Sequence, residues 1–91
     1  MKIHHERITR LNAMAVKHEM INAAQKGDAL LDLSLVSVVD SSAVALVLAW
    51  MRAVQTKGLE PRICGVPEKL VALMKLYGTY ALIGKNLQKK A

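Results

Sequence analysis

Hydrophobic and polar positions alternate along the chain in blocks that predict short strands separated by helices. Residues 30–33 and 61–64 are short segments rich in apolar residues and bounded by turn-forming residues, a pattern typical of buried strands. Between them, residues 43–51 form an uninterrupted apolar run that begins directly after polar helix-start residues. The middle of the chain is therefore predicted to fold as strand, helix, strand.

Start and stop residues predict three helices in all. Their expected ranges and boundary residues are 10–25 (Thr9 to Gly27), 42–57 (Asp40, Ser41 and Ser42 to Gly58) and 67–77 (Pro67 to Gly78). A further strand is expected at residues 3–8 and a last edge strand at residues 80–83, while residues 37–39 extend the connection toward the central helix. Alternating strands and helices imply right-handed crossovers between parallel strands. The fold class is therefore α/β, with a small, mostly parallel or mixed sheet of about four strands and helices packed on it.

The central helix is apolar around most of its circumference. Its two faces are predicted to hold Val44, Val47, Leu48 and Met51 on one side and Leu46, Ala49, Trp50 and Ala53 on the other. The first face can pack on the sheet. The second face either packs on a neighbouring helix or forms an exposed contact surface, and both alternatives are open here. Because tryptophan is enriched at the energetic centres of interfaces, we hypothesise that Trp50 contacts a partner.

Length and charge indicate one small basic domain. The 91 residues fit a single domain, which we expect over residues 1–84, with a basic tail at residues 85–91. The formal net charge of +6 can attract nucleic acid, an anionic membrane face or an acidic protein. Nucleic-acid binding is disfavoured because aromatic residues make up only 3% of the chain and no reading motif is present.

The first residues are polar and charged, and the longest apolar run is too short to cross a bilayer. We therefore expect neither a leader segment nor direct membrane insertion. The single cysteine, Cys64, indicates a reducing compartment, and a cytoplasmic location is expected.

The sequence contains no recognisable catalytic or metal-binding motif. His4, His5 and His18 are present, but no Gly-x-Ser-x-Gly elbow or phosphate-binding P-loop accompanies them. Adjacent histidines in a strand point to opposite faces, which makes a metal site at His4 and His5 unfavourable. We expect a protein that is not an enzyme and that holds no cofactor or metal.

The stretch from residue 30 to residue 78 resembles the STAS domain. The pieces that carry the resemblance are residues 32–34 (Asp-Leu-Ser), 40–43 (Asp-Ser-Ser-Ala), 57–58 (Lys-Gly), 62–65 and 66–77. Two departures stand out: the family glycine after the second serine is Ala43 here, and the N-terminal strand region is shorter than the family's two strands. The resemblance implies a binding and regulatory domain whose first strand is absent or supplied by a partner.

Two branches of the family are similar to this chain. The ending at residues 65–77, GVPEKLVALMKLY, resembles the STAS subunit of the bacterial Mla phospholipid ABC transporter. That branch implies binding to the transporter's cytoplasmic ATPase subunit at the inner membrane, in support of outer-membrane lipid asymmetry. The other branch is the anti-sigma-factor antagonist, whose partner is an anti-sigma factor serine kinase and whose phosphorylated serine corresponds to Ser41.

The resemblance also implies which residues bind the partner. The expected first surface comprises Asp40, Ser41, Ser42, Ala43, Leu46 and Trp50, and the second comprises Lys69, Leu70, Leu73 and Tyr77 on the last helix. From the residues alone, a hydroxyl at a helix start is also the ordinary N-cap. Ser41 is therefore interpreted either as a plain cap or as a docking and switching site.

Overall fold

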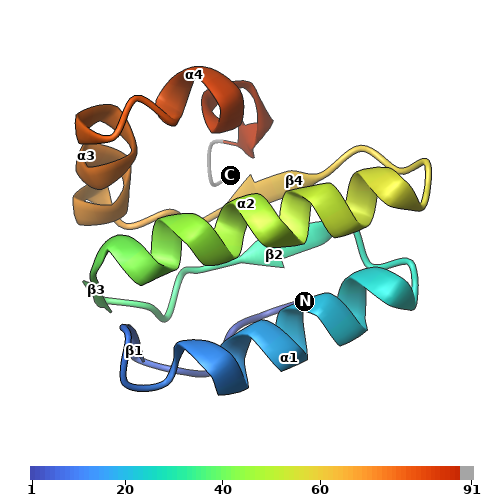
Figure 1. Cartoon of the computed structure of the whole chain (residues 1–91), viewed down its shortest axis with the longest axis horizontal. Coiled ribbons are helices and arrows are strands. Elements are labelled where there is room, and N and C mark those ends of the chain that lie inside the picture. The colour runs from blue at the N-terminus through green and yellow to red at the C-terminus, as the bar shows by residue number, and fades with distance from the viewer. Residues whose placement is uncertain (89–91) are drawn as a thin grey trace.

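A computed structural model describes residues 1–88 of the protein. Within that range, short strands alternate with four α-helices and one 3₁₀ helix (Figure 1). The elements in chain order are β1 (Arg7–Ile8), α1 (Ala13–Gln25), β2 (Leu30–Asp32), β3 (Val38–Val39), α2 (Ser41–Thr56), β4 (Arg62–Cys64), α3 (Glu68–Leu76), α4 (Tyr80–Ile83), η1 (Gly84–Asn86) and β5 (Leu87–Gln88). The α/β class predicted from the sequence is confirmed.

Every strand pair in the described residues is parallel. Strands β2, β4 and β5 form one ladder in that order, and β1 pairs with β3 in a second. The N-terminal segment joins the two ladders, because Ile3 donates its backbone N–H to the Asp32 carbonyl at 3.0 Å before the chain reaches β1. The single strand expected at residues 3–8 is therefore two short pieces that pair with different neighbours.

Helices cover one face of the strands. Ile8, Leu31 and Ile63 point to the helices and are buried, whereas their neighbours Arg7 and Arg62 point away and are exposed. This alternation is the two-residue period of a strand with one covered face. Figure 1 shows α2 lying across β2 and β4 with α1 alongside it, and α1 and α2 pack against each other. The core is accordingly a single aliphatic cluster around Trp50.

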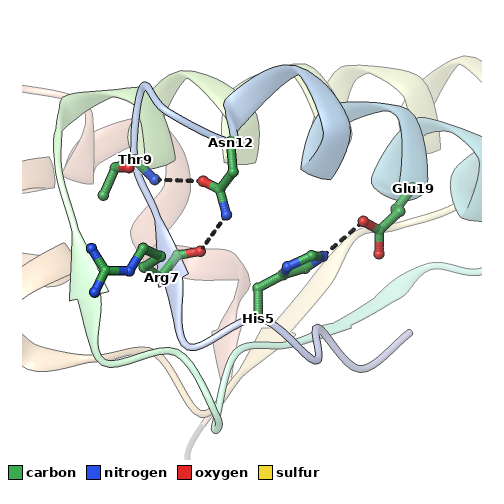
Figure 2. Close-up of polar contacts among 5 residues, drawn as sticks. All are labelled: His5, Arg7, Thr9, Asn12 and Glu19. Atoms are coloured by element: carbon green, nitrogen blue, oxygen red, sulfur yellow. Dashed lines mark hydrogen bonds and ion pairs between the residues drawn. The ribbon is translucent and has the colours of Figure 1, made fainter.

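The first helix begins later than predicted. Asn12 holds the preceding turn: its side chain accepts the Thr9 N–H at 3.0 Å and donates to the Arg7 carbonyl at 2.9 Å (Figure 2). Helix α1 therefore starts at Ala13 with Asn12 in the N-cap position, and the prediction that Thr9 caps a helix from residue 10 is wrong. The Asn12 amide makes both of these hydrogen bonds across the turn, and the Thr9 hydroxyl makes neither of them.

The C-terminal region also differs from the prediction. Residues 80–83, expected as an edge strand, form α4, and Ile83 on this helix is buried in the core. The last strand is β5, which pairs with β4, and Asn86 just before it donates to the Pro61 carbonyl at 2.8 Å. Residues 85–88 thus take part in η1 and β5, whereas the sequence prediction assigned them to a basic tail; residues 89–91 lie outside the described range.

Candidate partner-docking site

Asp40 organises the start of α2. It has an extended backbone and ends β3, where its N–H donates to the Ile8 carbonyl at 3.3 Å. One carboxylate oxygen accepts the Ser42 N–H at 2.8 Å and caps the helix, and the other accepts the Arg10 N–H at 3.0 Å. These hydrogen bonds hold the pKa of Asp40 below its ordinary value, and the bond from the Arg10 N–H has the largest effect. A single carboxylate therefore fastens helix α2 to the loop that follows β1.

Because Asp40 is the cap, Ser41 is not. Ser41 is the first residue of α2 and is exposed, and its hydroxyl makes no hydrogen bond with any described residue. The first backbone N–H groups of a helix have no partner within the helix and carry a partial positive charge. The structure thus presents a free hydroxyl at a helix end. This hydroxyl can form a hydrogen bond with a partner or carry a modifying group.

Replacing Asp40 with alanine is expected to lower the free energy of unfolding by about 1 kcal/mol at neutral pH, the usual cost of a lost N-cap. Since the folded-state pKa of Asp40 lies below the ordinary value of an aspartate, the carboxylate's contribution is complete above that ordinary value and is lost as the pH falls through the folded pKa. Urea denaturation at several pH values measures this. If Asp40→Ala lowers the free energy of unfolding by the same amount at the most acidic pH as at neutral pH, the assignment of Asp40 as an ionised N-cap is contradicted.

A shallow groove runs between α1 and α2 and includes Ser42, the residue after Ser41. Its volume is about 270 Å³, and its lining residues are Ala13, Met14, Lys17, Ser42, Ala45, Leu46 and Ala49. Most of these side chains are small. Met14 at the rim is 73% exposed, and Leu11 in the adjoining loop is 82% exposed. The groove is therefore open, largely apolar and flanked by two large apolar side chains that the monomer leaves in water.

Sequence reasoning missed the contribution of α1 to this surface. Leu11 and Met14 are apolar residues near the start of this helix, and an amphipathic helix ordinarily buries such residues. The buried stripe is instead Val16, Met20 and Ala24, which recur every four residues and lie on one face. Met14 is on roughly the opposite face of the helix from Val16. The four-residue spacing of the three buried residues could therefore have identified the exposed side from the sequence.

Trp50 is a core residue and not a surface residue. It is 0% exposed, and its indole N–H has no hydrogen-bond partner. The prediction that Trp50 contacts a partner is therefore wrong, because α1, α3 and the strands cover α2 on the sides that the sequence left open. Ala43 and Leu46 are also buried. Ala43 is in regular helix, where alanine is more favourable than the family's glycine, and its methyl group packs in the core.

The second predicted surface is divided between core and exterior. Lys69 on α3 and Tyr77 just after it are exposed and Leu73 is half-buried, whereas Leu70 is completely buried in the core. Only Lys69, Leu73 and Tyr77 are thus available for binding.

His5 makes a polar contact within the fold. His5 lies 2.8 Å from the Glu19 carboxylate and links the N-terminal segment to α1 (Figure 2). Across residues 1–88, no three His, Cys, Asp or Glu side chains are grouped so as to hold a metal ion. In the same range no helix has both the length and the hydropathy needed to span a membrane.

Comparison with known proteins identifies the family. The family model described as "Mlab, STAS domain" matches residues 5–84. The chain belongs to the STAS domain family. The motif at residues 40–43 of this STAS domain is the start of α2, so the family's characteristic sequence coincides with the exposed hydroxyl of Ser41. Among curated proteins, none matches this chain.

Two solved structures share the fold of this STAS domain. The anti-sigma factor antagonist SpoIIAA in its unphosphorylated form has a TM-score of 0.71 at 15% identity, with 99% of this chain and 76% of that chain covered. The Bacillus cell fate determinant SpoIIAA in its phosphorylated form has a TM-score of 0.67 at 15% identity, covering 99% and 79% respectively. At this identity the likeness establishes the fold and leaves the partner to be determined by other means.

Proposed function

We propose that this STAS domain is a non-enzymatic binding module that docks a partner protein at the start of α2 and in the α1–α2 groove. The observation that carries the proposal is the position of Ser41, whose free, exposed hydroxyl is on the residue directly before Ser42, which lines the apolar groove. In this proposal the domain has no chemistry of its own, and it acts by stabilising one conformation of its partner.

The groove is suited to a helix of the partner. Small side chains at Ala13, Ala45 and Ala49 let a helix approach closely, and helices are recognised by laying an apolar stripe into such a groove. Docking would also remove Leu11 and Met14 from water. Full burial of each such side chain is worth about 1.5–3 kcal/mol, so the two together supply a large part of a moderate affinity.

Ser41 is proposed as the regulatory residue of this surface. A phosphate on its hydroxyl would bring about −1.5 to −2 charges. The helix N-terminus favours that charge, but the Asp40 carboxylate next to it does not. The larger effect is that a strongly hydrated dianion would lie on the residue next to Ser42 of the apolar groove, where a partner helix must exclude water. Phosphorylation therefore releases the partner, and dephosphorylation restores docking.

The first candidate function is that of an anti-sigma-factor antagonist in the cytoplasm, with an anti-sigma factor serine kinase as the partner. The two SpoIIAA structures support it, because they share the fold and because one of them is in a phosphorylated form. The family's phosphorylated serine corresponds to Ser41. The kinase would then be both the docked partner and the enzyme that ends docking.

The second candidate function is that of an accessory subunit bound to the ATPase of a phospholipid ABC transporter at the inner face of the inner membrane. The description of the matching family model favours it, as does the ending Gly65 to Tyr77. The accessible residues Lys69, Leu73 and Tyr77 of the α3 region would add a second contact to the same partner. The docking surface on α2 is common to both candidates.

Isothermal titration calorimetry tests the proposal. It measures binding of the purified domain to each candidate partner from the same organism. Ala45→Glu places a charge in the groove at an exposed helical position and is expected to weaken binding by about a hundredfold. Ser41→Asp is expected to weaken it by about tenfold, and Ser41→Ala to preserve it. ATP-dependent phosphorylation of Ser41 by the bound partner identifies the kinase; stable co-purification with the ATPase identifies the transporter.

Ala15→Glu is the matched control, because Ala15 is an exposed alanine of α1 that does not line the groove. It should bind as the unmodified domain does. Equal affinities for Ala45→Glu and the unmodified domain would place the docking surface elsewhere.

A further inference from the structure

A second groove lies at the other end of α2, against α4 and η1. Its volume is about 270 Å³, and its lining residues are Leu48, Met51, Arg52, Gln55, Leu82 and Lys85. Leu82 at its edge is 62% exposed. Arg52 follows Ser41 by eleven residues on the same helix, which is about 16 Å along the axis at the rise of an α-helix. The second groove is therefore separate from the docking site at the start of α2.

The charges around this groove are unbalanced. Arg52 and Lys85 are exposed, and neither side chain forms an ion pair with a described residue. In the sequence, residues 69–91 contain lysines and neither Asp nor Glu; the lysines are Lys69, Lys75, Lys85, Lys89 and Lys90. Glu60 lines an adjoining hollow together with Lys85, without an ion pair between them. The groove thus presents two cations, and none of its own lining residues is acidic.

We propose that this groove binds a short acidic segment of a partner protein, with an apolar side chain seated between carboxylates. The floor offers Leu48 and Met51, which are largely covered, and Leu82 is available to close over an inserted leucine or phenylalanine. Arg52 and Lys85 line the same groove and complement carboxylates of the bound segment. A single concave groove suits an inserted side chain, whereas a bilayer surface is flat and would contact convex side chains.

This proposal is independent of the one for the start of α2. The two grooves share no lining residue, so a variant of one leaves the other intact. If both are used, the domain contacts a partner helix at one end of α2 and an acidic segment at the other. Binding at the second groove therefore adds affinity and fixes the orientation of the docked partner.

The test is selection of random peptides displayed on phage against the purified domain, followed by fluorescence-polarisation binding of the selected peptides. The expected result is enrichment of sequences with Asp or Glu on both sides of an apolar residue. Arg52→Glu combined with Lys85→Glu should weaken their binding by at least about tenfold. Lys26→Glu combined with Arg62→Glu is the matched control, since both residues are exposed and neither lines the groove. The control should change the affinity by less than about threefold.

Three outcomes would overturn the proposal. The first is a selection that enriches no acidic sequence. The second is peptide binding that both double variants weaken equally, which would show attraction to net charge alone. The third is peptide binding that the Arg52→Glu and Lys85→Glu double variant leaves unchanged, while the same variant loses binding to phosphatidylglycerol vesicles in a co-sedimentation assay. That result would assign the surface to a membrane. Circular dichroism of each variant verifies that the comparison is made on folded protein.

Discussion

Replacing Trp50 with alanine is expected to lower the free energy of unfolding by about 3–5 kcal/mol. The side chain is the largest in the core and is 0% exposed, so its removal leaves a cavity that the surrounding helices and strands fill only in part. The unpartnered indole N–H disfavours the native state of the unmodified protein, which moves the expected loss toward the lower end of that range. Small domains have a total of about 5–15 kcal/mol, so the variant will be marginally folded.

Urea denaturation followed by far-ultraviolet circular dichroism measures this loss, because Trp50 is the only tryptophan and its fluorescence is removed with it. Leu11→Ala is the control: this side chain is 82% exposed, and its loss should change stability by no more than about 0.5 kcal/mol. A Trp50→Ala variant within about 1 kcal/mol of the unmodified protein would contradict the buried position and would return Trp50 to consideration as a contact residue.

The second large effect is expected at Gly65, which joins β4 to α3. Its φ of +66° lies in the left-handed region, and an added Cβ would lie 2.8 Å from both the backbone N and the Cβ of Ser34. Alanine therefore incurs the left-handed penalty and also pushes the segment after β2 away from the end of β4. The two effects together should cost about 2–4 kcal/mol of stability, measured by urea denaturation with Trp50 fluorescence as the readout.

Gly78→Ala separates these two causes. Its φ of +71° is similar, but an added Cβ would meet no atom within 4 Å. This variant should lose only the conformational part, about 1–2 kcal/mol. Equal losses at both positions would mean that the backbone at Ser34 does not approach Gly65 closely.

The parts of the fold that were predictable are those determined by local chemistry. Helix α2 was placed to within one residue, because an aspartate cap at Asp40 and a positive-φ glycine at Gly58 define its two ends. Strands β2 and β4 and helix α3 were located for similar reasons. The exposed hydroxyl at Ser41 also follows from the sequence, once Asp40 is recognised as the residue that caps the helix.

The parts that were missed depend on tertiary contacts. Residues 80–83 have a strand-like composition, but they form a helix that directs Ile83 into the core, and β5 occupies the sheet edge instead. Trp50 lies on a helix with two apolar faces, and only the packing of the neighbouring elements determines which face water reaches. The groove beside Ser41 is made by two helices that are distant in sequence, so neither helix alone indicates it.

Amide hydrogen exchange of the domain, alone and with its partner bound, tests the central claim most directly. The account predicts added protection over residues 13–17 and 41–49, which form the α1–α2 groove, with the peptide around Trp50 equally protected in both states. Added protection confined to the uncovered face of the strands, around Arg7 and Arg62, with none at the start of α2, would contradict it.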